Sequence, residues 1–308
     1  MASLAAFLSL ADSIRRFSGR RQKACINYDP QVLGFLNDIG FLSVATDRDL
    51  FDWEPEDAMG GYAIGLTNPN TKVFAFPIAS DPPPRSDEAA WIGWKDYMRD
   101  RLRDTLMLTC QRVFEVKSKT KSFPRQLTNL MANTLAELAL NAAMWGRSLP
   151  FIAVQRSTKG ITAAVCDLGR GFRATLGEQK LLGISKETET PQPQDDLSAL
   201  ILASLINDEP KDFGLRKAIS QILKVNGWVV MSSGTGLVNW RATSWKRAIL
   251  RYEQDPNTIP HHSMLFSNAP EDLLEIAAME PGYYRQFRHK LKGVRVAFEI
   301  PFSNAGGE

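Results

Sequence analysis

Apolar residues recur along the chain at two spacings, and each spacing predicts a different kind of element. Steps of three and four, as in Trp91, Trp94 and Met98, predict helices. The helices predicted in this way cover residues 87–114, 127–145, 197–205 and 215–225. Short, mostly apolar runs bounded by turn residues predict strands over residues 151–156, 161–167, 228–232 and 294–300.

The first 86 residues carry a weaker and more mixed pattern. We predict a strand over residues 23–28, a helix over 31–45 that two glycines weaken, and a strand over 72–78. Pro77 suits an edge position for that last strand, because proline cannot donate a ladder hydrogen bond. Residues 80–86 and 186–196 are proline-containing and read as loops, and 241–291 reads as mostly helical with a break over 255–263.

Helices that alternate with hairpins predict a protein of mixed α/β content. The arrangement that we predict is an α+β sandwich, with helices on one face of a mixed or antiparallel sheet. The composition shifts divide the chain into an N-terminal α/β module (1–86), a helical connector (87–126) and a C-terminal domain (127–308). Residues 241–292 are predicted to be a mostly helical segment of that last domain, which the family resemblance described below makes a helical insertion.

Composition narrows the class of protein without identifying it. The chain has 308 residues, a net charge of +3 and three cysteines that are far apart in the sequence. No apolar run reaches the roughly 18 residues that a membrane span needs, and Arg15 and Arg16 follow the apolar start instead of preceding it, which argues against a signal peptide. We therefore expect a soluble, cytoplasmic protein for which a nucleic-acid partner is not favoured.

Two polar residues stand four positions apart on the helix predicted over 127–145. Glu137 and Asn141 therefore share one helical face, about 100° from the apolar stripe, and border the core. A carboxylate can take a proton from water, and an amide oxygen can bind a hard cation. The alternative interpretation is an ordinary polar edge of the helix.

A second motif ends the strand predicted over 161–167. Asp167 is followed by Gly169 and Gly171, a D-x-G-x-G pattern. The carboxylate can accept a hydrogen bond from an exocyclic amine, and the glycines let a flat ring or a phosphate come close to the backbone. The alternative interpretation is a simple turn.

A third motif, Gly214-Leu215-Arg216, opens the helix predicted over 215–225. Backbone N–H groups at a helix start suit phosphate, and Lys211 and Arg216 flank Gly214 at a distance from which they could reach a terminal phosphate. The polar stretch 186–196 lies between the second and third motifs and has the length of a lid. Residues 232–236, reading SSGTG, follow as a hairpin turn, and no P-loop sequence is present.

Taken together and in this order, these motifs resemble those of the GHKL ATPases, the superfamily of gyrase, histidine kinases, the heat-shock chaperone of ninety kilodaltons, MutL and the anti-sigma-factor kinases. The resemblance covers residues 127–300 and implies a Bergerat-type ATP-binding domain. It implies that Glu137 positions and activates water and that Asn141 holds Mg²⁺. It implies that Asp167 accepts from the adenine amino group, while Gly169, Gly171 and Gly214 shape the pocket and the phosphate cradle.

The sequence departs from the family pattern at three places. Trp145 stands where a basic residue often follows the Asn, Asp212 and Phe213 stand where further glycines are usual, and the last strand begins Gly293-Val294 instead of Gly-Thr. The histidines, His261, His262 and His289, all follow the motifs. The chain therefore lacks the upstream phosphoacceptor of a self-contained histidine autokinase.

Three functions fit this resemblance. The leading hypothesis is an ATP-dependent conformational switch with slow Mg²⁺-dependent hydrolysis. ATP would order the lid at 186–196, and the closed form would present a new surface to a partner or to a second copy of the chain. Residues 1–86 would be a sensor or partner-binding module. The second is a Ser/Thr protein kinase acting on a STAS-like partner. The third, motivated by Trp145 and Val294, is a degenerate domain that binds a partner without turnover. A stand-alone domain of this kind also points to a bacterial origin.

Overall fold

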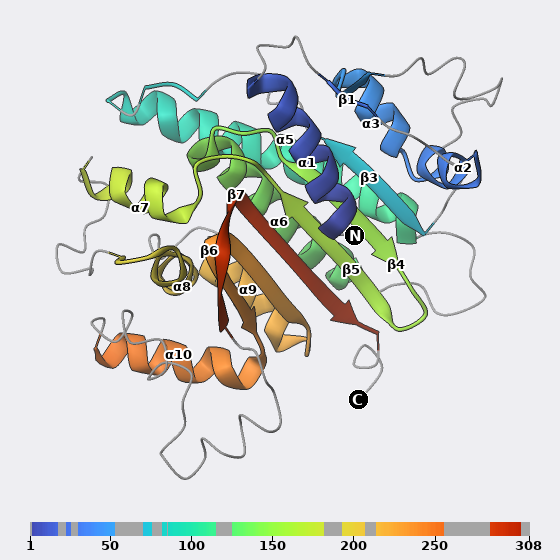
Figure 1. Cartoon of the computed structure of the whole chain (residues 1–308). Helices are drawn as coiled ribbons and strands as arrows, with labels where there is room; N and C mark the ends of the chain where they lie inside the picture. Colours follow the sequence, from blue (N-terminus) through green and yellow to red (C-terminus); the bar gives the residue numbers. More distant parts are fainter. Residues whose placement is uncertain are drawn as a thin grey trace.

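The structure is a computed structural model that describes residues 2–17, 23–25, 30–52, 70–75, 82–84, 86–114, 125–181, 193–206, 214–255 and 284–302 (Figure 1). Its α-helices are α1 (Ala2–Phe17), α2 (Pro30–Asp38), α3 (Phe41–Asp47), α5 (Glu88–Phe114), α6 (Arg125–Asn141), α7 (Phe172–Leu181), α8 (Asp196–Leu205), α9 (Leu215–Lys224) and α10 (Ala242–Gln254), and a π-helical turn, η1 (Ala142–Gly146), follows α6. Its strands are β1 (Ala24–Cys25), β2 (Phe51–Asp52), β3 (Thr71–Ala75), β4 (Phe151–Arg156), β5 (Gly160–Cys166), β6 (Trp228–Trp240) and β7 (Tyr284–Pro301).

Five strands form one sheet in the order β3-β4-β5-β7-β6, and every neighbouring pair is antiparallel. The α+β class is confirmed, and the sheet is antiparallel instead of mixed. Among the described strands, β3 lies at the edge of the sheet as predicted, while Pro77 lies outside the described residues. Because β3 pairs along β4, part of the first 86 residues belongs to the same sheet as the C-terminal strands. A separate parallel pair joins β1 and β2.

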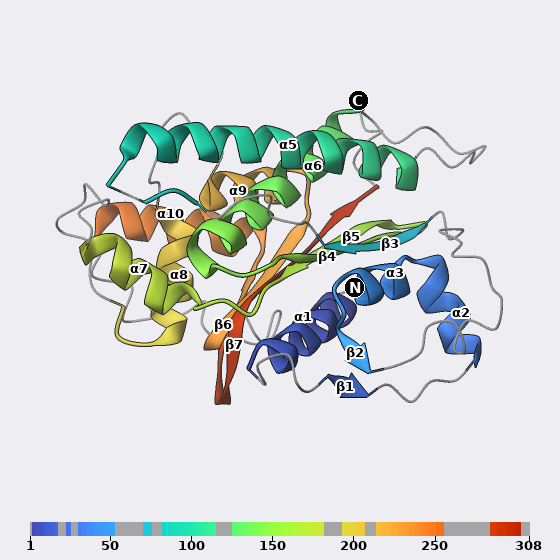
Figure 2. The same ribbon diagram turned by 90° about the horizontal axis from the view of Figure 1, so that it is seen from above.

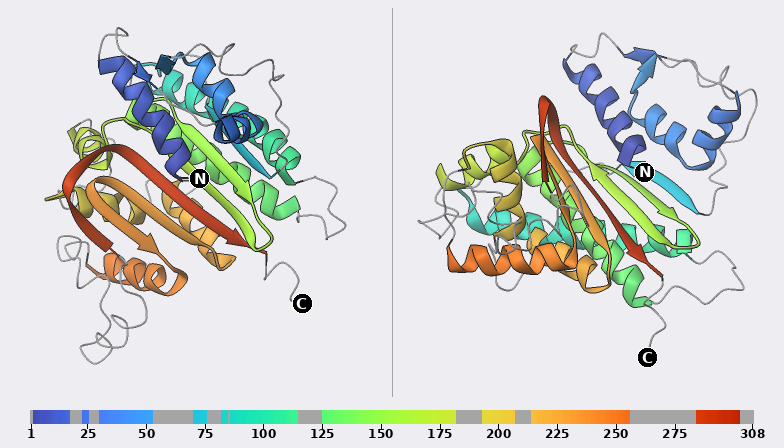
Figure 3. Two further views of the ribbon diagram at one scale, coloured as in Figure 1. Left: turned by 45° about the vertical axis from the view of Figure 1, so that its right-hand side comes forward. Right: turned by 60° about the horizontal axis from the view of Figure 1, so that its bottom comes forward.

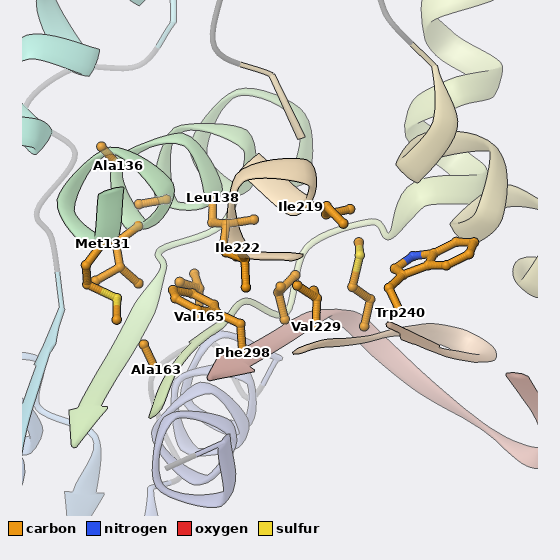
Figure 4. Packing of buried hydrophobic residues seen from close by; sticks show 14 of the residues in the cluster. Met131, Ala136, Leu138, Ala163, Val165, Ile219, Ile222, Val229, Trp240 and Phe298 are labelled. Carbon is orange, nitrogen blue, oxygen red and sulfur yellow. The ribbon is translucent and has the colours of Figure 1, made fainter. Parts of the chain in front are cut away.

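One face of the sheet carries α5, α6, α8, α9 and α10 (Figure 2). Apolar side chains of α6 and α9, among them Met131, Leu138 and Ile222, meet Val165 and Phe298 of the sheet (Figure 4). This layer is the largest buried cluster, and it fixes the position of α6 relative to the end of β5. That relation matters below, because both elements carry motif residues.

The opposite face is also covered, which differs from the prediction of helices on one face only. Helix α1 lies across β4, β5 and β7, and its Leu8 joins a second buried cluster with Phe41 and Phe151 (Figure 2). Phe7 of α1 stacks on Phe51 with ring centroids 5.5 Å apart. Strand β4 is therefore buried on both faces, which explains its continuous apolar run.

Two predicted helices are interrupted or replaced. The helix predicted over 31–45 is two helices, because Gly40 adopts a left-handed conformation with φ of 85° and ends the first. The helix predicted to extend to residue 291 is wrong over 284–291. These residues are strand, because Arg285 and Gln286 pair with Leu237 and Gly236 of β6.

Strands β6 and β7 form one side of the sheet and bend together there (Figure 3). Irregular register near Gly234 accompanies this bend. Residues 256–283, with His261 and His262, lie outside the described residues, as does most of the predicted lid. Within the part of the chain that the structure describes, no helix is both long and apolar enough to cross a membrane.

Candidate functional site

A pocket opens between the helical layer and one end of the sheet. It is lined by α5, α6, η1, α7, α8, the start of α9 and the strands β5 and β7, and it encloses about 160 Å³. That volume exceeds the space of a single bound water by roughly tenfold, so the pocket can hold a small molecule. Seven of the residues singled out from the sequence line it: Glu137, Asn141, Asp167, Gly171, Gly214, Leu215 and Arg216. Gly169 is buried behind the wall, against Gly146, and Lys211 lies outside the described residues.

Helix α6 places Glu137 and Asn141 side by side in the pocket wall. The opposite face of α6 is buried in the core. This packing fixes the rotation of the helix and keeps Glu137 and Asn141 at the pocket. The Asn141 Nδ2 amide donates a hydrogen bond to Glu137 Oε1 at 3.5 Å. Glu137 is only 4% exposed, more deeply buried than the sequence suggested. A carboxylate in this position faces the cavity and little bulk water.

The turn after Asn141 is wider than an α-helix. Residues Ala142–Gly146 form the π-helical turn η1, which brings Trp145 and Gly146 to the pocket. Such turns are rare and occur often at functional sites. The Trp145 ring lies near Trp91 of α5, with centroids 6.3 Å apart. Trp145 therefore joins α5 to the pocket wall at the position where a basic residue was expected from the resemblance.

Asp167 lies at the buried end of β5. Its Oδ1 accepts a hydrogen bond from the Gly169 N–H at 2.7 Å, and its own N–H donates to the Val294 carbonyl oxygen at 3.0 Å. Burial raises the pKa of the Asp167 carboxyl to about 7, against the lowering effects of the Gly169 and Val294 N–H groups and of Arg295. The group thus changes charge near neutral pH, inside a pocket of ligand size.

Three glycines allow the backbone to close around Asp167. A Cβ on Gly169 would lie 2.3 Å from the Gly146 carbonyl oxygen, and one on Gly293 would lie 2.0 Å from the Asp167 carbonyl oxygen. Gly293 also has a φ of 81°. The sequence pattern identified Gly169, whereas the packing roles of Gly146 and Gly293 depend on contacts between distant segments.

Ser233 of the SSGTG segment contacts the end of the D-x-G-x-G turn. Ser233 Oγ accepts a hydrogen bond from the Phe172 N–H at 3.2 Å, at the start of α7. Gly171, with φ of 78°, leaves room for that hydroxyl, because a Cβ there would lie 2.8 Å from it. The predicted hairpin turn is wrong, because residues 232–236 lie within the long strand β6.

Helix α9 starts at the pocket. Gly214 is its N-cap in an extended conformation, without a side-chain cap, and no other described residue has an atom within 4 Å of where its Cβ would be. The first N–H groups of α9 and the open space beside Gly214 suit an anion. Arg216 is held elsewhere, because its guanidinium donates to the Leu205 carbonyl oxygen at 3.1 Å and pairs with Glu253 of α10.

Sequence reasoning missed three cations that line the pocket: Lys95, Arg99 and Lys217. Lys95 and Arg99 stand one turn apart on α5, and Arg99 Nε lies 3.6 Å from Glu137 Oε2. Their helical spacing was visible in the sequence, but nothing in it indicated that α5 packs along α6. The pocket therefore combines two buried carboxylates with several cations.

The chemistry of the donors fits a hard cation with a phosphorylated ligand. The Asn141 amide oxygen and the Glu137 carboxylate are oxygen donors of the kind that Mg²⁺ accepts together with phosphate. No cluster of three His, Cys, Asp or Glu side chains occurs among the described residues, so a cation held by protein alone has no cage in that part of the chain. Comparison of the chain with models of known protein families, with curated proteins and with solved structures found no match.

Proposed function

We propose that the chain binds ATP with Mg²⁺ in this pocket and acts as an ATP-dependent conformational switch that hydrolyses ATP slowly. One observation carries the proposal. Residues from three separate motifs, spread from Glu137 to Arg216, line a single cavity. This convergence on one cavity supports a shared ligand site for residues that, taken one by one, could also be an ordinary helix edge or turn.

The Asp167 end of the pocket is suited to the base. Its ionised carboxylate would accept a hydrogen bond from the adenine amino group, and the neighbouring walls, Val165, Leu138 and Val296, are apolar. A hydrogen bond to a charged acceptor in a buried site is stronger than one between neutral groups. This combination would select adenine by one polar contact and by burial of a flat ring.

The α6 and α9 end is suited to the phosphates. Asn141 would contribute its amide oxygen to the cation, and the first N–H groups of α9 would face phosphate oxygens beside Gly214. When bound, Mg²⁺ would neutralise phosphate charge. Lys217, at the same end, would add positive charge from the protein.

Glu137 would orient and deprotonate the attacking water. It is buried, lies beside Asn141 and faces the cavity, as a general base requires. Transfer of phosphate would then depend on positioning and electrostatics. One general base contributes roughly 10²- to 10⁴-fold, which is compatible with slow turnover.

The proposed switch would act through α7 and α8, the two helices that both line the pocket and would both contact the nucleotide. Phe172 and Leu176 of α7 and Ala203 of α8 line the pocket, and the predicted lid, residues 186–196, connects these two helices. A ligand that contacts both would favour one arrangement of the connection over others. The closed arrangement would present a surface to a protein partner or to a second copy. The N-terminal module also offers exposed apolar side chains, Val32 and Phe35 of α2.

The test is Glu137→Gln, with phosphate release measured under Mg·ATP. We expect ATP binding to persist while release falls by about 10²-fold or more, because the amide cannot take a proton from water. Glu88→Gln on the exposed start of α5 is the matched control and should behave as wild type.

The fate of the γ-phosphate separates the alternatives. Labelled phosphate that arrives on a STAS-like protein instead of in solution would replace the switch by the protein-kinase function. A Glu137→Gln variant that matches wild type in every activity would contradict the catalytic role of Glu137, and the third hypothesis, a degenerate partner-binding domain, would survive.

A further inference from the structure

Helix α5 brings two cations into the pocket from outside the segment that carries the nucleotide motifs. Lys95 and Arg99 are four positions apart, so they lie on one face of the helix, and both line the cavity together with Glu137. Helix α5 runs for 27 residues and packs along α6. These two side chains are therefore the part of α5 that a ligand in the pocket would touch.

Arg99 is already engaged with Glu137. The Nε–Oε2 separation is 3.6 Å, and the two side chains are 18% and 6% exposed. Arg99 Nη1 also donates to Asp96 Oδ1 at 3.3 Å, on the exposed side of α5. A buried carboxylate needs a compensating charge, and Arg99 supplies it in the structure as described.

Helix α6 and η1 provide no cation to the described lining of the pocket. Trp145 occupies the position one turn after Asn141, and Arg216 of α9 is held by Leu205 and Glu253. The positive charge nearest to Glu137 therefore comes from α5. The end of the pocket where a terminal phosphate would meet Glu137 is thus the end that Arg99 occupies.

We infer that Lys95 and Arg99 recognise the terminal phosphate of a nucleoside triphosphate, and that Arg99 is shared between this phosphate and Glu137. This inference rests on the ATP-binding function proposed above. Without nucleotide, Arg99 pairs with Glu137. With ATP, its planar guanidinium turns to the phosphate oxygens, which carry more charge than one carboxylate. Glu137 is then released to orient water, and α5 responds to the presence of the third phosphate.

A purely structural role for Arg99 makes a different prediction. If Arg99 only neutralised Glu137, its removal would weaken the fold without changing the preference for ATP over ADP. If it contacts the terminal phosphate, its removal reduces that preference specifically. The ratio of the two dissociation constants therefore separates the two roles.

The experiment is calorimetric titration with Mg·ATP and with Mg·ADP. We expect wild type to prefer ATP, and Arg99→Gln to lose about tenfold or more of that preference, the factor typical of one charge-assisted hydrogen bond. Arg99→Lys should retain part of it because it keeps the charge. Arg103→Gln, one turn further along α5 and 45% exposed, is the matched control and should keep the wild-type ratio.

A second comparison tests whether a lost ATP preference in Arg99→Gln is caused only by misfolding. Arg99→Gln leaves the Glu137 carboxylate buried without its ion pair, so the same titrations compare Glu137→Gln with the Glu137→Gln/Arg99→Gln double variant. The loss of ATP preference should recur there. A double-mutant cycle on thermal stability should further give a coupling between residues 99 and 137 that is present without nucleotide and absent at saturating Mg·ATP.

The outcomes are distinguishable. Wild type that binds neither nucleotide overturns the proposed function and this inference with it. Wild type that prefers ATP, with the same ratio in both Arg99→Gln backgrounds, overturns the inference alone. A coupling between residues 99 and 137 that is unchanged by Mg·ATP refutes the sharing of Arg99.

Discussion

Asp167 titrates close to neutral pH because its burial opposes ionisation more strongly than its hydrogen bonds favour it. Its pKa of about 7 is raised, so the carboxyl is mostly protonated at pH 5.5 and mostly ionised at pH 8. The ionised form is the better acceptor for an amine. The charge that the proposed adenine contact requires is therefore gained as the pH rises through about 7.

ATP affinity should consequently increase from pH 6 to pH 8. The expected gain is up to about tenfold, as the fraction of ionised Asp167 rises. Titrations of Mg·ATP at a series of pH values measure it, and Asp167→Asn removes the group while keeping its size. A gain that is equally large in Asp167→Asn would assign the pH dependence to the nucleotide's own phosphates and contradict this role for Asp167.

For individual residues, the sequence predicted relative positions correctly when both residues belong to one helix, strand or turn. Glu137 and Asn141 share a face by helical spacing, and Asp167 ends a strand, so both relations could be inferred before any packing was known. Arg99 could not be found in this way, because its contact with Glu137 depends on how α5 and α6 pack. Arg216 lines the pocket, but its partners on α8 and α10 could not be foreseen.

Among the elements, the close approach of η1 to the turn after β5 depends on the absence of side chains. The backbone atoms of Gly146 lie where a Cβ on Gly169 would have to be, with the Gly146 carbonyl oxygen 2.3 Å away. No flexible side chain can yield there, so any larger residue must move the backbone. The shape of the Asp167 pocket follows from this contact.

Gly169→Ala should reduce the free energy of unfolding by about 1–3 kcal/mol, the usual cost of overpacking. Gly93→Ala, in the second turn of α5 and with no atom of the described residues within 4 Å of the new methyl, should instead raise it by about 0.5–1 kcal/mol. Urea unfolding of both variants measures the difference. Equal effects of the two substitutions would contradict the described contact between η1 and the β5–α7 turn.

The spacing of apolar residues was sufficient to predict most helices and strands. It failed where pairing with a segment distant in the sequence, or a left-handed glycine, determines the conformation. The strands β4 and β5 and the helices α5, α6, α8 and α9 are confirmed within a few residues of their predicted ends. Residues 284–291 read as helix but pair with β6 as strand, and Gly40 splits one predicted helix into α2 and α3. Each error arises where strand pairing or a left-handed glycine outweighs the apolar spacing.

Across the whole molecule, one antiparallel sheet separates two apolar layers (Figure 2). Nothing in the residue pattern indicated that the alanine-rich start of the chain would form α1 and cover the far side of β4 and β5. The pocket lies in the opposite layer, where Trp91, Trp94, Trp145, Trp240 and Trp245 belong to the buried cluster or pack against it. The two layers share the sheet, so we expect them to unfold together.

Leu8→Ala tests this coupling. Leu8 is fully buried in the layer of α1, so its truncation should cost about 2–5 kcal/mol. If the sheet couples both layers, tryptophan fluorescence measured in a Trp53→Phe background should report the same loss as far-ultraviolet circular dichroism. A fluorescence transition that stays at its wild-type midpoint would mean that the first helices fold independently of the pocket.

The central claim is that this pocket binds Mg·ATP, and thermal unfolding with and without Mg·ATP tests it most directly on wild type and Asn141→Ala. A ligand present at 100 times its Kd adds about 2.7 kcal/mol to the folded state. The account predicts a clear rise in Tm for wild type and a smaller, Mg²⁺-insensitive rise for Asn141→Ala. An unchanged Tm for wild type at millimolar Mg·ATP would contradict it and leave the pocket without its proposed ligand.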